Sequence, residues 1–258
     1  MSVPLPVRSA AWRELGLPGT LVVLDFDGTL ARIVHDRNAA RLSARTRRLL
    51  ARVAARYPVA VLSGRSAADV GGRLDGLPLR WVVGSHGADW AGGAAGGPRR
   101  WRGRIARWRR ALSERLEGLP GIDIEDKGHS ITVHYRAARD GARAAAAVSR
   151  AAADLTGAVV IPGKRVLNLL PEGAADKGSA LRRLAAVSGA ARLLFVGDDV
   201  TDEVAFRARL PIPAVMVRVG PIPGSAARYH VRRRGDVDRL LASLAVLRDP
   251  PRGGRRAR

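Results

Sequence analysis

Two aspartates, Asp25 and Asp27, are separated by one residue at the end of an apolar run and lead directly into a Gly-Thr pair. Carboxylates this close repel each other and need a cation, and carboxylate oxygens suit Mg²⁺. Gly28 allows a sharp turn whose backbone N–H groups can face an anion. The spacing therefore predicts metal-assisted chemistry on an anionic substrate. An aspartate-rich turn after a strand is the plain structural alternative.

A second acidic cluster follows the apolar run at residues 192–196. Four acids occupy six positions, from Asp198 to Glu203, in a chain whose net charge is +22. Helix capping with acids in the first turn explains the later members of the cluster but not Asp198. Such a concentration of carboxylates must be balanced by a metal cation or by basic side chains.

A third apolar run ends in Ser63 and Gly64, followed by Arg65. A hydroxyl group, a glycine N–H and the start of a helix together form a cradle for phosphate. A serine that only caps the following helix is the structural alternative.

Lysine is rare in this chain, so its positions are informative. All but three of the 45 basic residues are arginine, and the exceptions are Lys127, Lys164 and Lys177. Arginine is a planar fork and cannot replace a compact ammonium in a tight site. Lys177, which opens a helix after Asp176, is therefore a candidate functional residue. A capped helix with a solvated lysine is the alternative.

These motifs lie at the ends of elements that read as a parallel sheet. Short β-branched and apolar runs alternate with helical patterns, which predicts an α/β, Rossmann-like core with right-handed crossovers. Ligands bind at the carboxyl ends of such strands, where the motifs stand. The expected strands are residues 20–26, 58–63, 80–84, 192–196 and 214–219, and the expected helices are 43–56, 67–74, 176–186 and 201–209.

The middle of the chain has a different pattern and predicts an α+β insert. A small-residue linker at 91–98 precedes a helix at 99–116 with tryptophans on its apolar stripe, which favours packing over nucleic-acid contact. A strand at 130–135, a helix at 142–154 and strands at 158–161 and 165–170 follow. We therefore expect a discontinuous core at 1–90 and 172–258, an inserted domain at 91–171 and a disordered basic tail at 250–258.

Composition limits the class of protein. Of the 258 residues, 47% are hydrophobic, which is typical of a globular chain. The absence of cysteine excludes disulfides and thiolate metal sites. There is neither an N-terminal signal pattern nor an apolar run of about 20 residues, so we expect a cytoplasmic protein that does not enter membranes. The excess of arginine indicates a GC-rich genome more than a nucleic-acid surface.

The four motifs, in this order, resemble those of the haloacid dehalogenase (HAD) superfamily of phosphatases. The resemblance implies that Asp25 is the nucleophile that forms an aspartyl-phosphate and that Asp27 is first the general acid and then the base. It also implies that Ser63 and Lys177 hold the transferring phosphoryl group. Residues around the phosphate would include Gly28, Thr29, Gly64 and Arg65.

The same resemblance implies a Mg²⁺ cofactor. Its ligands would be the carboxylates of Asp25 and Asp198 and the backbone carbonyl of Asp27. Asp199 and Asp202 would orient water molecules or Lys177 around that metal centre. The insert between the second and third motifs implies a C2-type cap domain over the site.

The sequence from about residue 21 to 231 further resembles the trehalose-6-phosphate phosphatase family. The resemblance rests on the GDDxTDE and SGR motifs, on Gly84–Gly87 and on two cap segments, 125–136 and 162–166. One position departs from the family, because Asn168 stands where glutamate is common. The resemblance implies a set of sugar-binding residues, namely His86, Glu125, Lys127, His134, Arg136, Lys164 and Asn168.

The expected activity is hydrolysis of a sugar phosphate, trehalose 6-phosphate, by a monomeric enzyme without a specific nucleic-acid partner. One alternative is another capped sugar phosphatase of the sucrose-phosphate or mannosylglycerate-phosphate type. A second alternative, from a different class, is a basic nucleic-acid-binding protein whose acidic cluster has no catalytic role. Such a protein would lose affinity steeply as salt rises.

Overall fold

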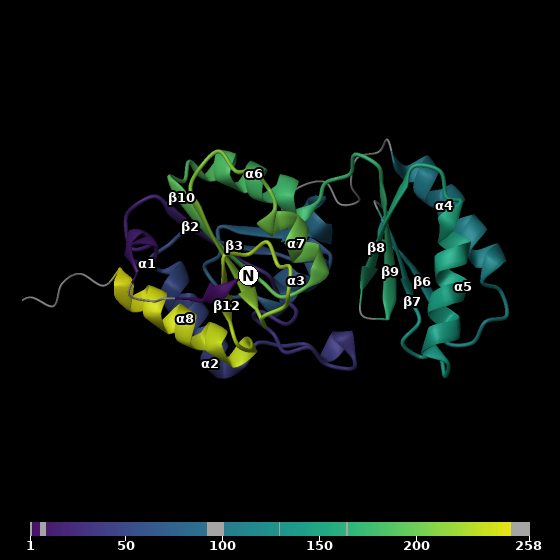
Figure 1. Cartoon of the computed structure of the whole chain (residues 1–258), viewed down its shortest axis with the longest axis horizontal. Helices are drawn as coiled ribbons and strands as arrows, with labels where there is room; N and C mark the ends of the chain where they lie inside the picture. The colour runs from purple at the N-terminus through teal and green to yellow at the C-terminus, as the bar shows by residue number, and fades with distance from the viewer. Residues whose placement is uncertain (1, 6–8, 92–100, 129, 164, 249–258) are drawn as a thin grey trace, which may run out of the picture.

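The computed structural model describes residues 2–5, 9–91, 101–128, 130–163 and 165–248. Two separate sheets organise these residues, one of eight strands and one of four (Figure 1). The larger sheet has the order β1-β12-β11-β10-β2-β3-β4-β5, and every neighbouring pair is parallel except β4 and β5. The expected α/β core with a parallel sheet is therefore confirmed.

The strands of the larger sheet are short and mostly apolar, and the central ones, β2, β3 and β10, are almost entirely buried. They are β1 (Val3–Pro4), β2 (Thr20–Leu24), β3 (Val59–Leu62), β4 (Trp81–Gly84), β5 (Asp89–Trp90), β10 (Arg192–Gly197), β11 (Ala214–Val219) and β12 (Tyr229–Val231). β2 lies at the centre, paired in parallel with β10 on one side and with β3 on the other. The carboxyl ends of three neighbouring strands therefore meet at one edge.

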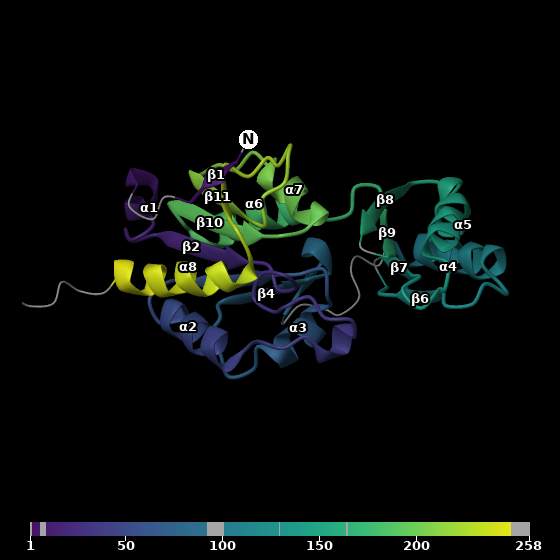
Figure 2. The ribbon, with the colours of Figure 1, turned by 60° about the horizontal axis from the view of Figure 1, so that its bottom comes forward.

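Helices cover both faces of this sheet (Figures 1 and 2). Val22 and Leu24 of β2 belong to the hydrophobic cluster that includes α1 (Ala10–Glu14), α2 (Ala44–Ala54) and α8 (Arg234–Leu247). The alternate residues of β2 pack on the opposite face, against α6 (Lys177–Ser188) and α7 (Val200–Phe206). Side chains alternate along a strand, so Asp25 falls on the α6 and α7 side.

Residues 101–171, here called the small unit, form the second sheet and its two helices. The antiparallel strands have the order β6-β7-β9-β8, and α4 and α5 cover the face that points away from the larger sheet (Figures 1 and 2). A hydrophobic cluster of its own includes Ile105, Trp108 and Leu112. The elements are α4 (Arg102–Arg115), β6 (Asp123–Asp126), β7 (Ile131–His134), α5 (Gly141–Ala153), β8 (Ala158–Gly163) and β9 (Val166–Pro171).

The predicted elements are present, with shifts at their ends. The helix predicted to reach residue 209 ends at Phe206, and the strand predicted from residue 165 begins at Val166, because Arg165 has a positive φ of 58°. Elements that the sequence pattern did not predict include α1, α8, β1, β5, β6 and β12. The domain boundaries at 90/91 and 171/172 stay predictions. Most of the predicted linker, Lys164 and the basic tail lie outside the described residues.

Three further elements belong to the described residues outside 101–171, here called the larger unit. They are the 3₁₀ turns η1 (Arg37–Ala39) and η2 (Ser85–Gly87) and the helix α3 (Ala67–Arg73). In the described part of the chain, every helix is too short or too polar to cross a bilayer.

Candidate active site

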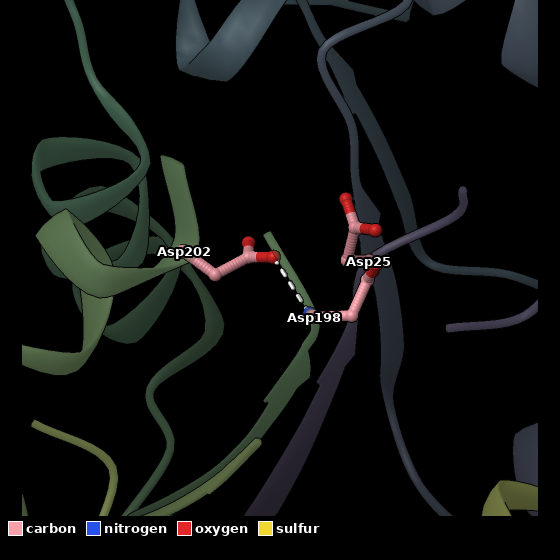
Figure 3. Close-up of side chains that lie close together, drawn as sticks. All are labelled: Asp25, Asp198 and Asp202. Carbon is pink, nitrogen blue, oxygen red and sulfur yellow. Dashed lines mark hydrogen bonds between the residues drawn. The ribbon is translucent and has the colours of Figure 1, made fainter. Parts of the chain in front are cut away.

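The acidic centre lies where β2 and β10 end side by side. One carboxylate oxygen from each of Asp25, Asp198 and Asp202 lies within 4.8 Å of the others. Figure 3 shows Asp25 and Asp198 adjacent, with Asp202 reaching the backbone nitrogen of Asp198. Asp25 and Asp198, separated by more than 170 positions in the sequence, are thus neighbours, as the resemblance described above implied.

Burial makes this centre electrostatically unfavourable without a cation. Asp25 is 4% exposed and Asp202 is 0% exposed. Burial, reinforced by Asp202, raises the pKa of Asp198 to about 7, and burial likewise raises the pKa of Asp25 well above its usual range. The ammonium of Lys177 is one positive charge beside three carboxylates, so an additional cation would relieve the repulsion between them.

Lys177, at the first turn of α6, is the basic side chain of this centre. Its Nζ lies 2.7 Å from Asp25 Oδ1 and 2.6 Å from Asp202 Oδ1. Burial lowers the pKa of Lys177, but the carboxylates of Asp202 and Asp25 outweigh burial and raise it above the ordinary value. The lysine is therefore charged, and it fixes the orientation of the Asp25 carboxylate.

Asp202 connects that lysine to the loop after β10. Its Oδ2 accepts hydrogen bonds from the backbone N–H groups of Asp198 and Asp199, both at 2.9 Å. Asp202 thus has partners on both oxygens, whereas the only hydrogen bond to the Asp198 carboxylate among the described residues comes from Thr29, at 3.2 Å. Asp199 is exposed and lines the cavity described below.

Gly28 makes room for the Asp198 carboxylate. Its φ is 82°, and a Cβ at this position would meet Asp198 Oδ2 at 2.0 Å. Its own N–H donates to the carbonyl of Ala31, at 2.8 Å. The glycine is required by conformation and by close packing together.

Gly28→Ala is expected to lower the free energy of unfolding by about 1–3 kcal/mol and to displace Asp198. Gly173→Ala is the matched control, since Gly173 also has a positive φ, of 73°, but nothing lies within 4 Å of its added Cβ. Urea denaturation and crystal structures of both variants check this. Equal losses in the two variants would show that the backbone, and not the carboxylate contact, sets the requirement.

Asp27 faces the cavity in a two-bond pair with Arg65. Arg65 Nε lies 2.6 Å from Asp27 Oδ2, and Arg65 Nη2 lies 2.7 Å from Oδ1. Arg65 is 6% exposed and also contacts Asp69 at 2.9 Å. The arginine predicted to meet phosphate or substrate therefore holds the second aspartate of the motif in this structure, while still lining the cavity.

Ser63, Gly64 and His86 gather at the end of β3. Ser63 is 1% exposed, and its Oγ accepts the N–H of Arg65 at 3.1 Å. The ring of His86 lies so close to Gly64 that a Cβ added to this glycine would come within 2.7 Å of His86 Cε1. His86 has a positive φ of 57°, and its backbone N–H donates to Ser63 at 2.9 Å.

A cavity of about 720 Å³ opens over the acidic centre and is lined by both units. This volume is in the range of small-molecule sites. The residues of the larger unit that line it include Asp25, Asp27, Gly64, Arg65, His86, Lys177 and Asp198. From the small unit, the predicted sugar-binding residues that line it are Lys127, His134, Arg136 and Asn168.

Four of the predicted sugar-binding residues of the small unit, namely Glu125, Lys127, His134 and Asn168, already have side-chain partners. Asn168 Oδ1 accepts from Thr132 at 2.9 Å, and Lys127 Nζ lies 3.4 Å from the carbonyl of Gly64. Glu125 lies beside the cavity, 2.8 Å from His134 Nε2. Burial alone would raise the pKa of Glu125, but hydrogen bonds from His134 and Arg37 hold that pKa well below its usual range.

Two arginines at this site escaped the sequence analysis. Arg37 contacts Glu125, and Arg218 of β11 donates to the carbonyl of Asp198 at 2.6 Å and to Glu203 Oε1 at 2.8 Å. Arg218 is buried, and these hydrogen bonds help to hold the segment that begins with Asp198 in place. In a chain with this much arginine, no spacing distinguishes either residue from the surface arginines.

The donor set fits a hard divalent cation. The carboxylates of Asp25 and Asp198 are adjacent, partly or fully buried and oxygen-only, and Asp198 has no basic partner among the described residues. Such oxygen ligands select Mg²⁺ over softer metals. Asp202 is already satisfied by Lys177 and two amides, so it suits an orienting role better than direct ligation.

Comparison with known proteins gives concordant matches. A family model described as trehalose-phosphatase matches residues 23–232. The trehalose-phosphate phosphatase of Mycobacterium avium (strain 104) is 40% identical over 247 residues, covering 90% of this chain and 59% of that protein. That of Mycobacterium tuberculosis (strain H37Rv) is 37% identical, covering 94% and 63%. The chain thus spans about three fifths of the length of these curated relatives.

Solved structures agree on the fold. The C-terminal domain of the Candida albicans trehalose-6-phosphate phosphatase matches with a TM-score of 0.76 at 23% identity, covering 95% of this chain and 98% of that one. The Aspergillus fumigatus trehalose-6-phosphate phosphatase matches with a TM-score of 0.66 at 26% identity, covering 95% and 99%.

Proposed function

Because the chain belongs to the trehalose-phosphatase family, we propose that it hydrolyses trehalose 6-phosphate to trehalose and inorganic phosphate. One observation carries the proposal: a buried aspartate, Asp25, is held by Lys177 at 2.7 Å beside a second carboxylate, beneath a cavity of about 720 Å³. A nucleophile, a charge-neutralising ammonium and space for a sugar are thus combined.

In the first step, Asp25 Oδ attacks the phosphorus atom. A bond from Oδ to phosphorus forms, and the bond from phosphorus to the sugar oxygen breaks. Asp27 gives its proton to that oxygen, which leaves as the sugar hydroxyl. In this structure Arg65 holds both oxygens of Asp27, at 2.6 and 2.7 Å, so at least one of these contacts must open before an Asp27 oxygen can carry the proton and deliver it.

In the second step, Asp27 takes a proton from a water molecule whose oxygen attacks the same phosphorus atom. The bond between Asp25 and phosphorus breaks, which restores the carboxylate and releases inorganic phosphate. Lys177 remains within 2.7 Å of Asp25 and stabilises the negative charge in both steps. Ser63 and the N–H of Gly64 would hold the non-reacting phosphoryl oxygens.

We assign Mg²⁺ to the carboxylates of Asp25 and Asp198 and to the backbone carbonyl of Asp27. When bound, the ion supplies positive charge that lets an anionic nucleophile approach an anionic phosphate. Thr29 and Asp202 keep Asp198 and its loop in place, at 3.2 Å and 2.9 Å.

Asp198→Asn tests this assignment. It should weaken the apparent affinity for Mg²⁺ by about tenfold to a hundredfold, because one anionic ligand becomes a neutral amide. Titration of EDTA-treated protein with Mg²⁺, followed by calorimetry and by phosphate release, measures the shift. Asp75→Asn is the control, because Asp75 is exposed and lies outside the cavity. An unchanged Mg²⁺ affinity in Asp198→Asn would remove Asp198 from the metal site.

In this proposal the small unit is part of a cap domain at 91–171 that covers the active site. The enzyme is proposed to be cytoplasmic and monomeric. Lys127, His134, Arg136 and Asn168 line its side of the cavity and would meet sugar hydroxyls. An amide at position 168 can donate and accept hydrogen bonds, so it retains contact with a hydroxyl without the charge of glutamate.

Phosphate release from a panel of sugar phosphates tests the substrate. The value of kcat/KM should be highest for trehalose 6-phosphate, compared with glucose 6-phosphate, sucrose 6-phosphate and mannosylglycerate phosphate. A preference for sucrose 6-phosphate would replace the substrate while leaving the phosphatase chemistry intact. Failure on every phosphate ester would refute the activity itself.

A further inference from the structure

Arg37 reaches from the larger unit across the cavity to the small unit. Its Nη1 lies 2.6 Å from Glu125 Oε2, and its Nη2 lies 3.1 Å from Oε1, so the guanidinium grips both oxygens of the carboxylate. The same Nη1 lies 3.2 Å from His134 Nε2. Glu125 and His134 stand on neighbouring strands, β6 and β7, so one arginine contacts two strands of the small unit.

The turn that carries Arg37 is fixed to the catalytic machinery. Arg65 Nη2, which also holds Asp27, donates to the carbonyl of Arg37 at 2.7 Å. Arg73 of α3 donates to the carbonyls of Asn38 and Ala40, at 3.0 and 2.6 Å. Arg37 is therefore mounted on a rigid turn whose position is defined relative to Asp27.

Few polar contacts join the two units elsewhere. In the described part of the chain, side-chain hydrogen bonds between them are limited to those of Arg37 and one from Lys127 Nζ to the carbonyl of Gly64, at 3.4 Å. Backbone hydrogen bonds from Glu172 to Gly157 and from Ala174 to Pro171 join the units only where the chain passes from one to the other. The contacts of Arg37 are shorter, charge-assisted and in a two-bond geometry, which makes them the stronger ones. Arg37 and Glu125 retain side-chain exposures of 33% and 29%, so water can compete for them when the units separate.

We propose that Arg37 is a positioning residue that latches the small unit over the acidic centre by binding Glu125 and His134. The role in turnover rests on the proposed function, because a latch matters only for a substrate held by both units. A sugar phosphate touches the small unit with its sugar and Asp25 with its phosphate. A small aryl phosphate such as p-nitrophenyl phosphate needs little of the small unit.

The kinetic test compares Arg37→Ala with wild type on these two substrates. KM for trehalose 6-phosphate should rise about tenfold in the variant, because charge-assisted contacts that hold the closed arrangement are lost. KM and kcat for p-nitrophenyl phosphate should change by less than about threefold. The control is Arg41→Ala, on the same loop, since the hydrogen bonds of Arg41 to described residues go to the carbonyls of Asn38 and Ala40 and not to the small unit. Equal changes with both substrates would overturn the proposal.

A structural test does not depend on the substrate. Small-angle scattering should give a larger radius of gyration for Arg37→Ala than for wild type and Arg41→Ala. The exchanged pair, Arg37→Glu with Glu125→Arg, should return the radius towards the wild-type value. If wild type fails on trehalose 6-phosphate but the radii follow this order, the substrate proposal fails and the latch stands. If the three radii are equal, the latch is refuted.

Discussion

Asp25→Asn should abolish turnover, with kcat reduced by about 10⁴-fold or more, while the protein stays folded. The amide cannot attack phosphorus, but it fills the same volume and its oxygen can still accept from Lys177, which lies 2.7 Å from Asp25 Oδ1. Removal of one of three buried carboxylates also relieves repulsion, so the melting temperature should be unchanged or higher. Phosphate release and thermal melts measure the two effects separately.

Asp75→Asn is the matched control for this exchange, because Asp75 is exposed and lies outside the cavity. It should retain wild-type activity. Activity of Asp25→Asn within tenfold of wild type would disprove the nucleophile assignment. A lower melting temperature together with lost activity would instead point to a structural role for the carboxylate.

Lys177→Met should have the second largest effect, on both stability and rate. The variant leaves Asp25 and Asp202 buried without their ammonium, which lies 2.7 and 2.6 Å from them. Breaking a buried ion pair on one side costs about 3–5 kcal/mol of unfolding free energy. Loss of the charge that stabilises the transition state should lower kcat by about 10³-fold. Urea denaturation and phosphate release are the measurements.

Arg182→Met, on an exposed position of the same helix, controls for helix propensity and side-chain loss. Lys177→Arg separates charge from shape, because its charge is kept but a planar fork must enter a site where lysine is 2% exposed. We expect Lys177→Arg to lose at least about a hundredfold in kcat. Wild-type activity in Lys177→Arg would mean that the rarity of lysine in this chain carries no information about the site.

The sequence was sufficient to predict the centre of the site because its residues follow buried parallel strands. β2, β3 and β10 are continuous apolar runs, and the residues at their carboxyl ends meet at one edge whatever the intervening chain does. That rule placed both acidic motifs at this edge, and the pairing of Asp25 with Asp198 came from the resemblance to the HAD phosphatases. Asp202 and Lys177 followed from an acidic cluster and a rare lysine, since both patterns depart from the arginine-rich background.

The remaining contacts of the site could not be predicted, because they depend on tertiary placement. Arg37 and Glu125 are separated by 88 positions and belong to different units, so no local spacing relates them. Arg65 was expected at the phosphate, but its partners are Asp27 and Asp69. β1 and β12, with two and three residues, are too short to show an alternating pattern. They pair with each other only because the larger sheet offers an edge.

A crystal structure of the protein with Mg²⁺ and beryllofluoride, a stable mimic of a phosphoryl group, tests the central claim most directly. The account predicts beryllium bonded to a carboxylate oxygen of Asp25, Lys177 in contact with that carboxylate, and the metal bound by Asp25 and Asp198. Beryllofluoride attached to another residue, or a metal bound away from Asp198, would contradict it.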